Sequence, residues 1–101
     1  MRQVRWSREA RDAQRAWLDH LETIDPRLTD RALAESEALS TSTGKRPYSF
    51  RPSRWGGLRE ASLIRWHKII VFRVTKDAVA IIAFYDARQN LSRVHPTTES
   101  N

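Results

Sequence analysis

Two apolar segments separated by a short turn constrain the fold of this chain most strongly. Residues 67–74 (HKIIVFRV) and residues 78–85 (AVAIIAFY) are rich in β-branched and aromatic residues, which favour β-strands. The intervening Thr75-Lys76-Asp77 is typical of a hairpin turn. The second segment is apolar on both of its faces, as expected for a central strand whose sheet is covered by helices on one side. The sequence therefore predicts an antiparallel hairpin near the middle of a sheet.

The N-terminal half predicts one short strand and two helices. Residues 3–6 alternate polar and apolar side chains, a strand pattern. Ser7 is suited to cap a helix, and apolar residues recur at helical spacing over residues 10–24. Asp25-Pro26 ends this helix, because the residue before a proline is pushed out of the α region. A second helix is predicted over residues 27–40, and the short connection makes the pair an antiparallel hairpin.

A polar and basic loop is expected between the second helix and the sheet. The Ser/Thr/Gly run at residues 40–44 is typical of a break in a helix. Pro47 and Pro52 are expected to keep the following stretch irregular. Gly56-Gly57 then allows a sharp turn into a further strand over residues 58–63.

Together these elements predict an α+β fold. An N-terminal strand and an antiparallel helical hairpin pack on a mostly antiparallel four-stranded sheet. The chain has 101 residues, the usual size of one domain. We expect a single domain over residues 1–94 and a polar C-terminal tail over residues 95–101.

Composition excludes several classes of protein. Cysteine is absent, which excludes disulfides and Cys-based zinc sites. No apolar run approaches the ~20 residues needed to span a bilayer, and the N-terminus has no apolar stretch typical of a secretory signal. A cytoplasmic protein is therefore expected.

The positive charge is concentrated in one segment. The whole chain has 18 Lys and Arg residues against 12 Asp and Glu, a formal net charge of +6. Residues 44–74 contain eight basic residues and only one acidic residue, Glu60, so this segment alone carries +7. Such a segment favours acidic or polyanionic partners, although it also suits an ordinary solvated surface.

Catalytic and metal-binding constellations are missing from the sequence. His20, His67 and His95 do not have the spacing of a metal pair, so we expect no metal and no cofactor. Glu60 is more typical of an ion-pair partner than of a general base. The arginines on or beside predicted strands remain, and a pair such as Arg59 and Arg88 can either stabilise a phosphate or bind a carboxylate.

The order of elements, together with four sequence stretches, resembles the ParE/RelE superfamily of toxins from bacterial type II toxin–antitoxin systems. The likeness extends from Gln3 to Val94. The stretches are Trp6-Ser7-Arg8-Glu9-Ala10, Gly57-Leu58-Arg59-Glu60, Lys68 to Val74, and Tyr85 to Leu91.

The resemblance implies a toxin neutralised by an acidic, ParD-like antitoxin that wraps the helical hairpin and the sheet. Trp17, Leu21 and Leu28 are expected in the core or, where they protrude, as antitoxin anchors. Arg73 is also expected to contact the antitoxin.

Two activities compete within the resemblance. RelE-like toxins cleave mRNA on the ribosome, and Arg59 and Arg88 align with two functional arginines of that branch. The preceding lysines are replaced by Trp55-Gly56-Gly57, and Val94 stands where a C-terminal tyrosine is expected, which leaves His95 as a poor substitute acid or base. ParE-like toxins poison DNA gyrase without such a catalytic set, and this branch is favoured.

The residues expected to contact the target are all arginines. Arg59 and Arg88 are the principal candidates, supported by Arg93, Arg51 and Arg54.

A third hypothesis is a small basic nucleic-acid-binding module without toxicity. Its basis is the interleaving of aromatic residues with the basic residues of segment 44–74, because aromatic rings can stack on bases. The aromatic residues are Tyr48, Phe50, Trp55 and Trp66. They lie in a predicted loop, where filling gaps in the core is the competing explanation.

Overall fold

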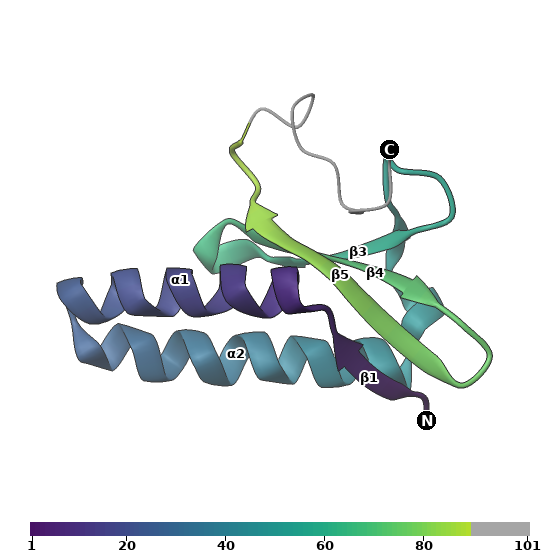
Figure 1. The fold of residues 1–101 in the computed structure, drawn as a ribbon, viewed down its shortest axis with the longest axis horizontal. Helices are drawn as coiled ribbons and strands as arrows, with labels where there is room; N and C mark the ends of the chain where they lie inside the picture. The colour runs from purple at the N-terminus through teal and green to yellow at the C-terminus, as the bar shows by residue number, and fades with distance from the viewer. Residues whose placement is uncertain (90–101) are drawn as a thin grey trace.

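The computed structural model describes residues 1–89 and consists of a helical hairpin and one sheet (Figure 1). The expected boundary at residue 94 and the tail at residues 95–101 lie outside the described residues. The elements in chain order are β1 (Gln3–Trp6), α1 (Arg8–Ile24), α2 (Pro26–Lys45), the 3-10 turn η1 (Pro47–Ser49), β2 (Arg51–Pro52), β3 (Arg59–Leu63), the 3-10 turn η2 (Ile64–Trp66), β4 (Lys68–Val74) and β5 (Ala78–Asp86).

The sheet has the strand order β1-β5-β4-β3-β2. β1 runs parallel to β5, and all other neighbouring strands are antiparallel. The helical hairpin lies against one face of the sheet (Figure 1). The α+β prediction is confirmed, except that the sheet has five strands instead of four. The extra strand is β2, in which Arg51 pairs with Glu60 and Pro52 with Arg59. A proline is tolerated there because β2 is an edge strand.

The second helix is longer than predicted. It continues past residue 40 to Lys45, because the Ser/Thr/Gly run packs against β1 instead of meeting solvent. The Ser40 hydroxyl accepts a hydrogen bond from the Trp6 indole at 3.0 Å, and Thr43 is fully buried. At Gly44 a side chain would lie 2.6 Å from the Arg2 carbonyl oxygen. The run is therefore a site of close helix–strand packing.

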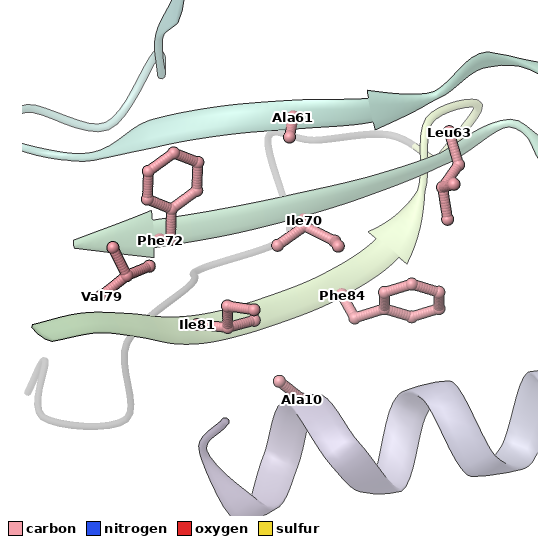
Figure 2. Packing of buried hydrophobic residues seen from close by; sticks show 8 residues of the cluster. All are labelled: Ala10, Ala61, Leu63, Ile70, Phe72, Val79, Ile81 and Phe84. Carbon is pink, nitrogen blue, oxygen red and sulfur yellow. The ribbon is translucent and has the colours of Figure 1, made fainter. Parts of the chain in front are cut away.

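The main core lies between the helices and the sheet (Figure 2). Ile70 and Phe72 of β4 and Val79 and Ile81 of β5 are fully buried. On the helical side, α1 presents Ala10, whose small side chain lets the helix approach β5. Burial stabilises each large side chain by ~1.5–3 kcal/mol relative to exposure. These residues explain why the hairpin segments are so strongly apolar.

A second apolar cluster lies on the other face of the sheet. It contains Leu58, Ile69, Val71 and Tyr85, with Trp55 packed against them. The Trp55 and Tyr85 rings meet edge-to-face at 5.9 Å between centroids. β4 and β5 are thus apolar on both faces because helices cover one face and the Trp55 loop packs on the other.

Polar side chains join the two helices. Gln14 is buried and donates to the Ser36 hydroxyl and the Glu37 carboxylate, each at 2.9 Å. Arg11 also pairs with Glu37. Burial raises the pKa of Glu37, but the hydrogen bonds from Arg11 and Gln14 outweigh that effect and leave the pKa below its ordinary value. This network fixes the hairpin geometry.

No helix in the part of the chain that the structure describes combines the length and the apolar character needed to cross a membrane.

Candidate functional sites at the two ends of the sheet

The structure places Arg59 and Arg88 at different ends of the sheet. Arg59 at the start of β3 pairs with Phe72 of β4. Arg88 follows Asp86, which pairs with Lys68 at the opposite end of β4. The β4 partners of these positions are four residues apart, about 13 Å along a strand. The two arginines are therefore not brought together around one phosphate.

The end that holds Arg88 contains a cleft of about 610 Å³ between α1 and the ends of β4 and β5. We call it the cleft end. Its apolar wall includes Ala13, Ala16, Trp17 and Phe84, and its charged side chains are Lys68, Asp86 and Arg88, with His20 beside them. His20 and Lys68 were not among the predicted site residues. For Lys68, the sequence signal was the hairpin, which pairs Lys68 with Asp86 and so places it at this end of the sheet.

Asp86 joins the charged groups of the cleft end. Its carboxylate accepts hydrogen bonds from Arg88 Nε at 3.0 Å, Arg88 Nη2 at 2.9 Å and the Arg88 backbone N–H at 2.8 Å. Lys68 Nζ lies 3.7 Å from the same carboxylate. The hydrogen bonds from Arg88 hold the pKa of Asp86 well below its ordinary value, and in return they raise the pKa of Arg88.

Lys68 is a partly buried cation of the cleft. Burial, with a contribution from the Arg88 charge, lowers its pKa despite the attraction of Asp86. Its ammonium group also lies over the Trp17 ring, 5.6 Å from the centroid. Two cations share one carboxylate here, so this group of residues carries a net positive charge.

The predicted antitoxin residues are divided between several environments. Trp17 is half-buried, lines the cleft and packs edge-to-face on Trp66 at 5.6 Å. Leu21 is buried and only 7% exposed, so it offers little surface to a partner. Leu28 is half-buried on α2, and Arg73 is exposed in β4. Strand alternation puts Arg73 on the same face as Val71, the face away from the helices.

The opposite end of the sheet holds Arg59 beside an exposed tyrosine. The Arg59 guanidinium lies over the Tyr48 ring at 5.0 Å and donates to the Phe50 carbonyl oxygen at 2.6 Å. The Arg2 guanidinium lies over the same ring at 5.4 Å and donates to the Thr75 carbonyl oxygen at 2.9 Å. Among residues 1–89, no carboxylate lies within 4.0 Å of either guanidinium.

The remaining residues predicted to contact the target differ in whether an ion pair within the chain already engages them. Arg51 forms an ion pair with Glu60 at 2.6 Å, which confirms the expected role of Glu60. Arg54 is exposed and lies over the Trp55 ring at 5.7 Å. Arg93 and His95 lie outside the described residues.

Three of the four aromatic residues proposed to stack on bases are used in packing. Phe50 packs on Phe72, Trp55 on Tyr85, and Trp66 on Trp17. Only Tyr48 of this set is largely exposed, at 62%. Within residues 1–89 no cluster of three metal-ligating side chains occurs.

Comparisons with known proteins bear on the fold. No protein-family model and no curated protein matches the sequence. A chain in a solved structure described as the chromosomal ParDE TA system from P. aeruginosa is similar, with a TM-score of 0.78 and 23% identity. The similarity covers 87% of the present chain and 98% of that chain. The expected ParE-like fold is therefore confirmed.

Proposed function

We propose that this chain is the toxin of a type II toxin–antitoxin system, acting in the cytoplasm and neutralised by a cognate ParD-like antitoxin. The observation that carries the proposal is the fold shared with a chain of a ParDE system over 98% of that chain's length. The sequence resemblance to ParE and RelE toxins points in the same direction.

The cleft end suits the antitoxin. It combines an apolar wall containing Trp17 and Phe84 with the cations Lys68 and Arg88. An antitoxin segment that folds on binding needs apolar anchors, and acidic side chains on it would compete with Asp86 for these two cations. Charge would guide the encounter, and burial of apolar side chains would hold the complex.

For the target, we propose DNA gyrase, inhibited through binding and not through catalysis. Arg59 and Arg88 lie too far apart to stabilise the same phosphate. Arg59 is the leading contact residue because no carboxylate neutralises it within the described residues. Arg51, Arg54, Arg88 and Arg93 remain supporting candidates.

Ribosome-dependent mRNA cleavage is the second candidate, and one observation favours it. His20 and Lys68 line the same cleft as Arg88, and burial lowers the pKa of Lys68. Lys68 as the proton-transfer group and Arg88 as the phosphate-binding cation would thus lie in one cleft, as such a reaction requires.

The two targets are separated by pulse-labelling DNA and protein synthesis within minutes of inducing the chain alone in bacteria. A fall in DNA synthesis first, and inhibition of purified gyrase in a supercoiling assay, would support gyrase. An earlier fall in protein synthesis would support mRNA cleavage. If neither falls and growth continues, the toxin proposal is wrong.

A further inference from the structure

Several chain segments gather at the end of the sheet that holds Arg59. Figure 1 shows the C-terminal end of α2, the start of β1 and the β4–β5 turn close together. The Arg2 N–H donates to the Gly44 carbonyl oxygen at 3.0 Å, and the Gln3 N–H donates to the Asp77 carbonyl oxygen at 3.3 Å. We call this region the cationic end and define it by Arg2, Lys45, Arg46, Arg59 and Lys76 around Tyr48.

The two arginines at its centre are held in place but not neutralised. Each guanidinium stacks on Tyr48 and donates one hydrogen bond to a backbone carbonyl, Arg59 to Phe50 and Arg2 to Thr75. A guanidinium has five N–H donors in a rigid plane, so most donors of both side chains remain for an anion. Fixing them before binding reduces the conformational entropy that is lost when an anion is bound.

The surrounding charge has the same sign. Lys45 and Arg46 end α2, and Lys76 follows Thr75 in the turn. No ion pair within residues 1–89 involves Lys45, Arg46 or Lys76. Asp77 is the one acidic residue of the turn. Five cations against this one carboxylate leave a strongly positive local field.

The cationic end offers charge but few apolar anchors. A hollow of about 340 Å³ beside Arg59 is lined by Tyr48, Pro52, Gly57, Leu58 and Val74. Leu58 is only 6% exposed and Gly57 has no side chain. Buried apolar contacts anchor a partner such as the proposed antitoxin, and the cleft end supplies more of them than this end does. A nucleic-acid backbone needs positive charge and N–H donors.

We propose that the cationic end binds the phosphodiester backbone of nucleic acid, with Arg2 and Arg59 as paired phosphate ligands held by Tyr48. The contacts are to phosphate, so binding is independent of base sequence. The proposal does not depend on gyrase being the target, because binding is measured on the chain alone.

The test is fluorescence anisotropy of labelled 20-residue oligonucleotides with the purified full chain, across a series of salt concentrations. Single-stranded DNA, single-stranded RNA and duplex DNA form separate arms that show which polymer is preferred. We expect R2A/R59A to weaken binding at least tenfold and to lower the slope of log K against log salt by about 1 to 2. R2K/R59K should recover part of the affinity, since charge is retained while bidentate geometry is lost.

The matched control is R15A/R31A, which removes two exposed helical arginines and the same net charge. Thermal melting verifies that every variant is folded. Equal losses of oligonucleotide affinity for R2A/R59A and R15A/R31A would overturn the proposal, because they would mean that net charge alone determines the affinity. Unchanged binding of R2A/R59A would also overturn it, as would poly-glutamate displacing the oligonucleotide as well as unlabelled DNA does.

Discussion

The two ends of the sheet use the same side chain in opposite ways. At the cleft end, Arg88 donates two guanidinium N–H groups to the Asp86 carboxylate, and Lys68 shares the same carboxylate. At the cationic end, Arg59 and Arg2 are held by a tyrosine ring and by backbone carbonyls, which carry no net charge. The first arrangement partly neutralises its cations and places them beside an apolar cleft wall. The second positions its cations without neutralising them. The difference is consistent with the two proposals, an antitoxin bound at the cleft end and a nucleic-acid backbone bound at the cationic end.

The largest expected effect concerns the cleft and its proposed antitoxin. Ala16 is exposed and lines the cleft, so A16R places a long cation in the space that the partner needs while leaving the core untouched. We expect the antitoxin to bind about 100-fold more weakly, the loss typical of an interface hot spot. Isothermal titration with the co-expressed antitoxin measures this effect. The neighbouring variant R15A is the control. If A16R binds the antitoxin with full affinity, the cleft is not part of the antitoxin interface.

A smaller effect is expected on stability when the carboxylate shared by Lys68 and Arg88 is removed. D86N leaves Lys68 partly buried beside another cation, at a cost of about 1–3 kcal/mol in the free energy of unfolding. Urea denaturation measures this cost, with the exposed Asp19→Asn as the control.

The same variant tests the pKa of Asp86. Its ordinary value is 3.8 and the folded protein lowers it, so its stabilising contribution is present above that pH and is lost as the pH falls through the lower folded value. Wild-type stability should therefore decline below about pH 4 more steeply than that of D86N. Identical pH profiles would show that the Asp86–Arg88 pair does not contribute to folding.

The smallest expected effect separates the two arginines by function. R59A and R88A should both fold and both reduce growth arrest, R59A by about tenfold in the inducer concentration required, in line with the loss of one charged contact. R88A should lose less toxicity and more antitoxin affinity, because Arg88 lines the cleft. Dose–response growth curves with and without the antitoxin measure both quantities. Full toxicity in both folded variants would contradict the assignment of these residues.

Local sequence patterns accounted for most of the fold but not for its longest helix. The hairpin of β4 and β5 could be predicted because two segments rich in β-branched and aromatic residues flank a short polar turn. The end of α2 could not, since the run from Ser40 to Gly44 has the composition of a loop. Only its burial against β1, where Trp6 binds Ser40 and Gly44 meets Arg2, makes a helix favourable there.

The sequence by itself determined the α+β class, the positive charge, and the arginines available for binding an anion, because these follow from composition and short-range periodicity. Tertiary structure decided which groups surround these arginines. Strand register places Lys68 opposite Asp86, the carboxylate that Arg88 binds, and the fold brings Arg2 to Tyr48, more than forty residues away in sequence, beside Arg59. Such pairings depend on contacts between distant segments, and local sequence patterns do not specify them.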